Sequence, residues 1–341
     1  MAKNQSAIVN WSQYLSLRAL SGFMHCFDVQ QNLSTAASVG SLYYRLSKRH
    51  RERAENNIAL SFPDWSHQQV QDIAHRSIQS MFQLILVDAL VTPRCITQSS
   101  WPSYIRIGDM PRTVERLIRK QPAIFITGHC GNWELLGYCL AVFGYPLNAL
   151  ARPLDNPLLN RWVMGIRQER GMRIITKWGA APILQKMLED GEWIGFIADQ
   201  NAGDQGLFVP FFGRMASSYK SIGLLAMRYN IPIVAGVAHR INGRFEYELS
   251  CTDYITPEDW QNQPDPLFYI TTRYNRAMEQ MILKAPEQYL WVHRRWKSRP
   301  RYERQGKPMP KRMIDKLRSL PWMTPSELDL IVDRSCPVES K

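Results

Sequence analysis

The chain has 341 residues, of which 45% are hydrophobic and 11% aromatic, a composition that excludes a disordered protein. A chain of this length can bury a sizeable core without disulfides or structural metals. The formal net charge of +12 points to an anionic partner, such as nucleic acid, a lipid surface, a phosphate-bearing ligand or an acidic carrier protein.

The N-terminal part of the chain is predicted to be helical. Residues 5–60 form the first helical stretch, and a second is expected to start at a cap on Asp64 or Ser66 and to run to about residue 90. Apolar residues recur there at a spacing of four, at Trp11, Leu15, Ala19, Phe23 and Phe27. This face fits either a helix packed on the core or a helix over residues 11–27 that lies in a membrane interface. We expect neither a signal peptide nor a membrane span, which would need roughly 18–20 successive apolar residues.

After a short strand and helix between residues 105 and 120, predicted strands and helices alternate from residue 122 to residue 234. The predicted strands are short apolar runs at residues 122–128, 147–151, 173–176, 193–199 and 231–240. The helices between them include one capped by Asn132 and one capped by Ser217 or Ser218. Asn242-Gly243 predicts a hairpin, and a helix over 267–285 and a strand over 289–293 are expected to complete the core.

The alternation predicts an α/β fold with a mostly parallel central sheet flanked by helices. We divide the chain into a helical N-terminal region (1–100), an α/β core (101–300) and a basic, polar C-terminal tail (301–341). Positive charge is concentrated near the end, because residues 284–318 contain twelve Lys or Arg and three acids. No nucleic-acid-binding module accompanies this tract, so we expect no nucleic-acid partner.

Three polar clusters follow predicted strands, at residues 129–134, 152–156 and 199–206. Because ligands bind at the carboxyl ends of strands in such sheets, we expect these clusters to meet in one crevice. In the first cluster, Glu134 in the first helical turn can reach back toward His129 and fix its tautomer. No Gly-x-Ser-x-Gly elbow supplies a nucleophile, so the histidine would activate a substrate hydroxyl or water directly.

The first cluster also allows a cysteine nucleophile or a metal site. Cys130 is adjacent to His129 and would point to the opposite face of an extended segment, so an inert buried thiol is the preferred interpretation. A zinc site needs three or four ligands, and the sequence provides no His-Glu-x-x-His and no paired Cys or His, so we expect no metal. The six cysteines are scattered without a Cys-x-x-Cys pair, which excludes a disulfide scaffold and favours a reducing compartment.

Four ordered motifs, "GHCGNWE", "ARPLDNPLLN", "ADQNAGDQGLFVPFFGR" and "PEQYLWVHRRWKSRP", resemble those of the lysophospholipid acyltransferase superfamily. The closest resemblance is to the bacterial lipid A biosynthesis acyltransferases. It implies the αβα fold of glycerol-3-phosphate acyltransferases, with His129 as the base and Glu134 as its orienting carboxylate. It also implies that no metal or cofactor is needed.

The other motifs contribute candidate substrate-binding residues. Arg152 can bind a phosphate or the developing oxyanion. Asp199 and Gln200 are expected to hold Arg152 or a substrate polar group, or to cap their loop. Asn132, beside His129, is a further candidate for substrate binding.

Two later segments complete the set of candidates. Phe211 and Gly213, within "GLFVPFFG", would line an acyl-chain channel or simply pack in the core. His293, Arg294 and Arg295 fit a phosphate-rich headgroup or an acidic acyl carrier.

The sequence thus predicts an acyltransferase that moves a fatty acyl group from an acyl carrier protein or coenzyme A thioester to a hydroxyl of a membrane glycolipid or lysolipid. The enzyme is expected to lie on the cytoplasmic face of the inner membrane, peripheral or monotopic, against an anionic lipid surface. The alternatives are a thioesterase or lipid hydrolase, and a non-catalytic lipid- or RNA-binding protein.

Overall fold

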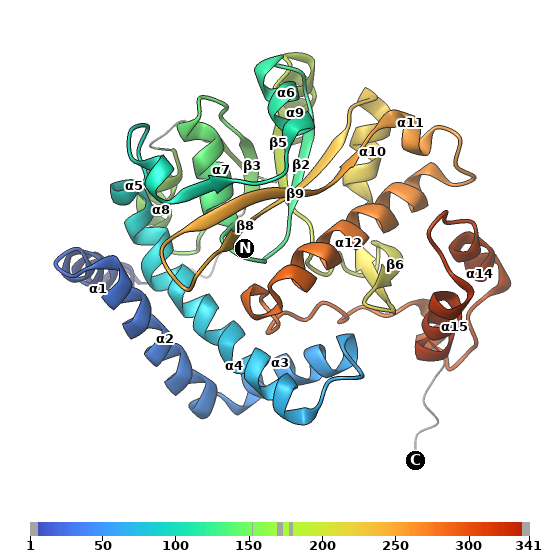
Figure 1. Ribbon diagram of the computed structural model, residues 1–341, viewed down its shortest axis with the longest axis horizontal. Helices are drawn as coiled ribbons and strands as arrows, with labels where there is room; N and C mark the ends of the chain where they lie inside the picture. Colours follow the sequence, from blue (N-terminus) through green and yellow to red (C-terminus); the bar gives the residue numbers. More distant parts are fainter. Residues whose placement is uncertain (1–5, 152, 169–172, 177–179, 336–341) are drawn as a thin grey trace.

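The structure is a computed structural model that describes residues 6–151, 153–168, 173–176 and 180–335 (Figure 1). Its helices are α1 (Ala7–Met24), α2 (Val29–Leu46), α3 (Lys48–Ser61), α4 (His67–Gln83), α5 (Ala89–Cys95), α6 (Pro111–Ile118), α7 (Trp133–Val142), α8 (Pro157–Gln168), α9 (Ala180–Glu189), α10 (Lys220–Tyr229), α11 (Pro257–Trp260), α12 (Pro266–Lys284), α13 (Arg301–Arg304), α14 (Lys311–Arg318) and α15 (Pro325–Arg334). Its strands are β1 (Ile105–Ile107), β2 (Ile124–Thr127), β3 (Asn148–Ala151), β4 (Arg173–Thr176), β5 (Ile194–Ile197), β6 (Leu207–Phe211), β7 (Arg214–Ser218), β8 (Ile233–Arg240) and β9 (Tyr247–Ile255). A π-helical turn, Leu84–Asp88, joins α4 to α5.

The centre of the molecule is a seven-stranded sheet with the order β1-β9-β8-β2-β5-β3-β4. All neighbouring strands pair in parallel except β8 and β9, which form an antiparallel hairpin. Asn242 and Gly243 make the turn of this hairpin with positive φ angles of 56° and 64°, as the Asn-Gly pair predicts. The predicted α/β fold with a mostly parallel sheet is confirmed.

The sheet separates two hydrophobic cores because successive side chains of a strand point to opposite faces. On β2, Ile124 and Ile126 pack in the core formed with α9, α10 and α12, whereas Phe125 packs in the core formed with α2, α5 and α7. All four residues of β2 are buried. Because β2 packs on both of its faces, the start of the loop that follows it is fixed in position.

The N-terminal helices lie along one side of the molecule and α14 and α15 along another (Figure 1). Ser66 caps α4 in a capping box with Gln69, and Asn132 caps α7, as predicted. Residues 301–335 are folded: Leu317, Leu328 and Ile331 are buried in the core that contains α12. The segment predicted to be a polar tail is therefore a packed helical extension in its described part.

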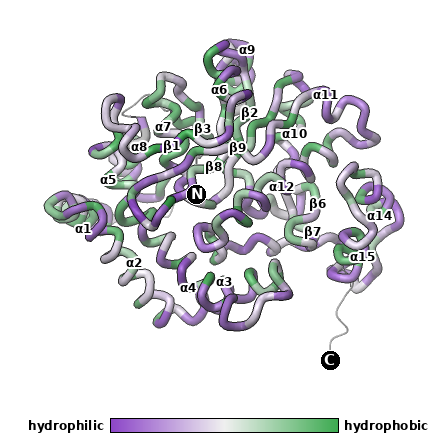
Figure 2. The backbone as a smooth tube through the Cα atoms, in the orientation of Figure 1, coloured by the Kyte–Doolittle hydropathy of each residue, from purple (hydrophilic) through white to green (hydrophobic). Residues whose placement is uncertain are grey.

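The apolar face of α1 does not pack on the core, so the first of its two predicted alternatives is wrong, and the membrane-interface alternative stays a prediction. Trp11, Leu15 and Phe23 are 51%, 57% and 63% exposed, and Phe27 just beyond the helix is 46% exposed. The helix instead buries Ser21 and Met24. Hydrophobic positions recur along α1 in Figure 2, although this helix lies at the edge of the molecule. None of the helices in the described ranges has the length and apolar content to cross a bilayer.

Two other predictions are corrected. The segment 289–293 is not a strand, because Tyr289 makes one isolated bridge, to Cys130, and turns follow it. The "GLFVPFFG" segment forms β6 and the turn of a hairpin whose second strand is β7. Ser217 and Ser218 therefore end β7 rather than cap α10.

Candidate active site

His129 lies on the loop between β2 and α7, and backbone hydrogen bonds fix this loop on both sides. The amide of Leu290 donates to the carbonyl of His129 (2.9 Å), and the amide of Gly131 donates to Gln288 (3.0 Å). The amide of Asn132 donates to the carbonyl of Ala238 on β8 (2.8 Å). The segment around residue 289, which was predicted to be a strand, therefore holds the loop that carries His129 by backbone hydrogen bonds.

The loop passes very close to β8, and a glycine makes this possible. Gly131 has a φ of +60°, and a Cβ at this position would lie 2.2 Å from the carbonyl oxygen of Ala238. A side chain cannot fit there, and the left-handed conformation disfavours one as well. Gly131, the second glycine of "GHCGNWE", is thus needed for the turn that positions His129.

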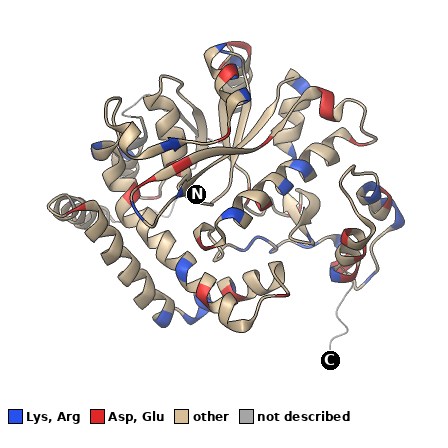
Figure 3. Cartoon of the chain, viewed as in Figure 1, with Lys and Arg blue, Asp and Glu red and all other residues tan. Residues whose placement is uncertain are grey.

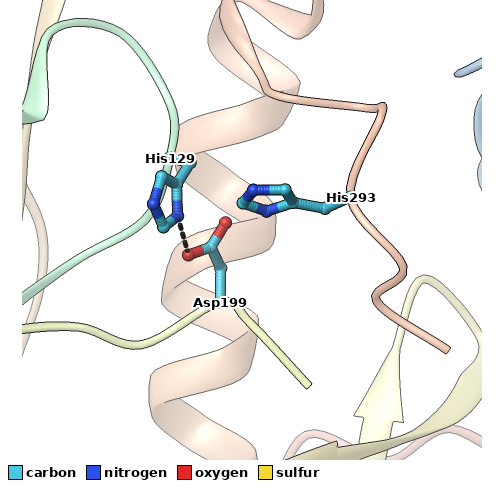
Figure 4. Close-up of side chains that lie close together, drawn as sticks. All are labelled: His129, Asp199 and His293. Atoms are coloured by element: carbon cyan, nitrogen blue, oxygen red, sulfur yellow. Dashed lines mark hydrogen bonds and ion pairs between the residues drawn. The ribbon is translucent and has the colours of Figure 1, made fainter. Parts of the chain in front are cut away.

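His129 Nδ1 lies 2.8 Å from Oδ1 of Asp199, which follows β5 (Figure 4). The aspartate side chain is fully buried and the histidine side chain is 14% exposed. A carboxylate can only accept, so Nδ1 carries the hydrogen, and in the neutral ring Nε2 then keeps its lone pair. This is the tautomer that a general base requires.

The charge of Asp199 is set by two opposing effects. Burial would raise the pKa of this carboxyl, but the interactions with His129, and more weakly with His293, outweigh it and hold the pKa well below its usual range. The group is therefore an ionised carboxylate behind the imidazole, and it can stabilise the imidazolium that forms when Nε2 takes up a proton.

A second imidazole stands beside the first. The rings of His129 and His293 are 4.6 Å apart and nearly perpendicular, at 76°. The side-chain nitrogen of Gln200 lies 3.5 Å from Nε2 of each histidine. Burial and the neighbouring His129 lower the pKa of His293 to about 4, so this ring is neutral near pH 7. The structure thus brings together four of the sequence candidates from three separate segments.

These side chains are also the one group in the described residues with the composition of a metal site. His129, Asp199 and His293 each offer a ligand atom, and the three atoms lie within 4.8 Å of one another. Two ligands around a tetrahedral Zn²⁺ would be about 3.3–3.6 Å apart, given bonds of about 2.0–2.2 Å. The 2.8 Å contact between Nδ1 and Oδ1 is shorter and fits a hydrogen bond. A metal would require the two side chains to separate, and the absence of a metal remains a prediction.

Glu134 lies in the first turn of α7, as predicted. The partner of His129 Nδ1 is nevertheless Asp199, so the structure gives the orienting position to a different carboxylate. Arg152 lies outside the described residues, and its expected contacts with substrate or with Asp199 stay predictions.

An apolar cavity of about 360 Å³ begins beside Glu134. Trp133 contributes to its wall, and the Trp133 ring also contacts His129 at a centroid distance of 4.7 Å. The remaining lining comes from α1, the π-helical turn, α5, α7, the loop before α8 and α8 itself. It is mainly apolar: Leu17, Leu84, Ile85, Asp88, Ala89, Leu90, Thr92, Pro93, Leu135, Tyr138, Leu154 and Val163. The side chain of Trp133 therefore lies between the cavity and the ring of His129.

Two other candidates are structural in their placement. Asn132 is buried, caps α7 and donates from Nδ2 to Asp88 (3.1 Å), which is itself paired with Arg240. Phe211 is buried in the core, and Gly213 makes the turn of the hairpin with a φ of +68°. For Phe211 this favours core packing over a channel wall.

Arg295 does not lie on the surface, as contact with a headgroup would require. It is 2% exposed, and its guanidinium donates to the carbonyl of Ser217 and to the side chains of Ser218 and Asn275. The neighbouring Arg294 is exposed. The basic motif is therefore divided between one arginine that holds the hairpin and another that faces solvent.

The chain matches the family described as bacterial lipid A biosynthesis acyltransferase over residues 6–298, and it belongs to this family. It is 26% identical over 274 residues to the lipid A biosynthesis palmitoleoyltransferase of Escherichia coli (strain K12), covering 77% of this chain and 83% of that protein. It is 24% identical over 269 residues to the lauroyltransferase of the same pathway and organism, covering 77% and 84%. Identity to the lipid A biosynthesis myristoyltransferase of that strain is 24% over 301 residues, covering 85% and 88%. The resemblance inferred from the four motifs is confirmed.

Proposed function

We propose that this protein transfers a fatty acyl group from an acyl thioester to a hydroxyl of a lipid A precursor, with His129 as the general base. The observation that carries the proposal is the hydrogen bond of 2.8 Å between His129 and a buried, ionised Asp199. Membership of the lipid A acyltransferase family supports both the reaction type and the class of acceptor. The donor would be an acyl carrier protein or coenzyme A.

The reaction needs one proton carrier and no protein nucleophile. Nε2 of His129 takes the proton of the acceptor hydroxyl while its oxygen attacks the thioester carbonyl carbon and forms the C–O bond. The C–S bond then breaks, and the thiolate recovers the proton from the imidazolium. Asp199 stays ionised throughout and stabilises the charged ring. Glu134 would supply a second carboxylate near the thioester, since it also lines the apolar cavity.

The acyl chain of the donor would occupy that cavity. Its lining is mainly apolar, and Trp133 connects it to His129. A chain placed there would bring its thioester carbonyl to the edge of the imidazole. Burial of methylene groups contributes about 0.8 kcal/mol each, so the cavity can supply much of the affinity for the donor.

Helix α1 would attach the enzyme to the cytoplasmic face of the inner membrane as a peripheral protein. Its exposed face carries Trp11, Leu15 and Phe23, while Leu17 of the same helix lines the cavity. Arg18 contacts the ring of Trp162 on α8 and helps to hold the helix in place. An apolar helix at the cavity wall would let lipid chains pass between membrane and site without crossing water.

The test is the transfer of a radiolabelled acyl group to a lipid A precursor by purified protein, with products separated by mass. We expect His129→Ala to lower the rate by about 10²–10⁴-fold, the usual contribution of a general base, with an unchanged circular dichroism spectrum. Full activity in this variant would overturn the mechanism. Release of free fatty acid in the presence of acceptor would instead indicate a hydrolase. Dialysis against EDTA is expected to leave the rate unchanged.

A further inference from the structure

Arginines from two distant parts of the chain meet beside His293. Asn57 on α3 donates from Nδ2 to the carbonyls of Trp291 (2.7 Å) and His293 (2.8 Å). One turn earlier, Arg53 donates to the carbonyl of Val292 (3.3 Å). These bonds fix α3 against the segment that carries His293. In Figure 3, basic residues mark both α3 and the segment that follows α12.

Three arginines lie where α3 contacts the segment that carries His293. Arg49 and Arg53 are one turn apart on α3, and Arg294 follows His293. Arg49 and Arg294 are exposed and Arg53 is partly buried. The pKa of Arg53 is lowered by burial and then by the nearby charges of Arg294 and Arg49. Arg53 therefore lies close enough to both other arginines for their charges to act on it.

The two acids of the same helix have other partners. Glu52 is paired with Lys48 (3.7 Å), and Glu55 accepts a hydrogen bond from Tyr44 (2.6 Å). Across the described residues, no carboxylate forms an ion pair with any of the three arginines. Arg49 and Arg53 line an open hollow on the surface of α3, together with the paired Lys48 and Glu52 and the amides of Asn56 and Asn57.

The two sides of His129 differ in chemistry. Trp133 contacts the ring on the side of the apolar cavity. His293 contacts the ring as well, and its neighbour Arg294 belongs to the basic cluster. If the acyl chain occupies the cavity, the side near His293 is left for the acceptor.

We propose that Arg49, Arg53 and Arg294 bind a phosphate group of the acceptor lipid and thereby place its hydroxyl against His129. The inference rests on the proposed acyltransferase function, which it extends by assigning a headgroup site. Guanidinium groups bind phosphate oxygens in pairs of charge-assisted hydrogen bonds. A phosphate, with a charge of about −2 near pH 7, would also offset most of the positive charge gathered around Arg53.

The test compares Arg49→Gln, Arg294→Gln and the double variant with the wild-type enzyme. Arg228→Gln is the matched control, because Arg228 is an exposed arginine on α10, far along the chain from the cluster. The acceptor is used in a phosphorylated form and in a form from which phosphatase has removed the phosphate. We expect each single variant to raise KM for the phosphorylated acceptor about ten-fold, as the loss of one charge-assisted bond would. The KM for the donor should not change, and none of the variants should further impair use of the dephosphorylated acceptor.

Binding is measured separately, so that failure of this site and failure of the acyltransferase proposal can be distinguished. His129→Ala protein, with and without the two arginine changes, is mixed with phosphatidylcholine vesicles that contain the phosphorylated lipid, the dephosphorylated lipid or phosphatidylglycerol. We expect the arginine changes to weaken binding only to vesicles with the phosphorylated lipid. Equal weakening on phosphatidylglycerol would show a general anionic contact and overturn the site. A rise in the donor KM would overturn it in favour of a donor phosphate. Arginine-dependent binding by the His129→Ala protein, together with no acyl transfer by the wild-type enzyme, would uphold the site and refute the reaction.

Discussion

Separate substitutions of Asp199 and Glu134 can test which carboxylate orients His129. Asp199→Asn removes the charge that stabilises the imidazolium, and its amide can also turn to donate to Nδ1 and so impose the wrong tautomer. We expect kcat to fall by about 10²–10⁴-fold, with KM for the donor little changed. Glu134→Gln serves as the comparison. A large loss of kcat in Glu134→Gln with normal turnover in Asp199→Asn would return the orienting role to Glu134.

Cys130, next to His129 in the sequence, is expected to be replaceable. It is 1% exposed, and burial raises the pKa of its thiol far above the usual range, so no reactive thiolate forms near pH 7. Its Sγ faces His239 (3.6 Å) and the carbonyl of Met281 (3.7 Å). Cys130→Ala should keep kcat within about two-fold while lowering stability by roughly 1 kcal/mol through the small cavity it leaves. Steady-state assays and urea denaturation of the same preparation check both values.

For the individual residues of the site, the sequence predicted that the segments carrying His129 and Asp199 lie close together, but it did not predict which carboxylate forms the hydrogen bond to His129. His129, Asp199 and Gln200 follow parallel strands, so their convergence follows from topology. The choice of Asp199 as the partner of Nδ1 depends on the orientation of the ring in three dimensions, which a spacing of five residues between His129 and Glu134 cannot determine. Arg295 was misplaced for a similar reason, because a run of basic residues does not reveal which member is buried.

The loop between β2 and α7 gives a prediction at the scale of an element. Gly131→Ala places a Cβ against the carbonyl of Ala238 in a left-handed backbone conformation. We expect a loss of stability of more than about 1 kcal/mol and a fall in kcat, because the loop that carries His129 must move. Gly165→Ala on α8 is the control. A Cβ there meets nothing within 4 Å, so this change should be neutral or stabilise by about 0.5–1 kcal/mol.

Helix α1 is expected to bind membranes through its exposed face. Leu15→Gln and Phe23→Gln together remove two large apolar side chains, each contributing about 1.5–3 kcal/mol when it is transferred from water. Binding to lipid vesicles, measured by co-sedimentation, should weaken at least ten-fold. Ile118→Gln on α6 is the control, because Ile118 is 63% exposed, as Phe23 is. Equal vesicle binding by all variants would contradict the role of α1.

Among the elements, periodicity predicted the strands and helices of the core well, because their apolar residues are buried on one or both faces. It failed where local pattern and tertiary context disagree. The segment 289–293 contains β-favouring residues but meets only Cys130 in a bridge. The β6–β7 hairpin was missed because Pro210 and the Gly213 turn resemble a loop, and only the pairing of the two segments makes them strands.

At the scale of the molecule, the C-terminal helices extend the fold beyond the matched family region, which ends at residue 298. Arg334 of α15 donates to the carbonyl of Phe212 in the β6–β7 turn (2.9 Å), and Arg299 donates to the carbonyl of Met215. The C-terminal extension is therefore hydrogen-bonded to the β6–β7 hairpin, which follows the loop that carries Asp199. Composition alone suggested a polar tail, because the few apolar residues that anchor it are separated by basic ones.

Glu279 on α12 links the same hairpin to the core and makes the stability of the protein depend on pH. Its carboxyl group accepts a hydrogen bond from the amide of Phe212 (2.6 Å). Burial raises the pKa of Glu279 to about 7, above its ordinary value of 4.5. Between these values the folded protein holds a proton that the unfolded chain has lost. The contribution of Glu279 to stability is therefore complete below pH 4.5 and is lost as the pH rises through about 7.

Glu279→Gln keeps the shape and the acceptor oxygen but cannot ionise. We expect it to be about as stable as the wild type at pH 5 and more stable at pH 8, by up to about 3 kcal/mol at 1.36 kcal/mol per pKa unit. Urea denaturation at both pH values measures the difference. The pKa values of His239 and His293 are lowered to about 4, so both favour stability at higher pH, but they are present in both proteins and cancel. Glu189→Gln, an exposed change on α9, should leave the wild-type pH dependence intact. Parallel loss of stability in wild type and Glu279→Gln as the pH rises would show that another group is responsible.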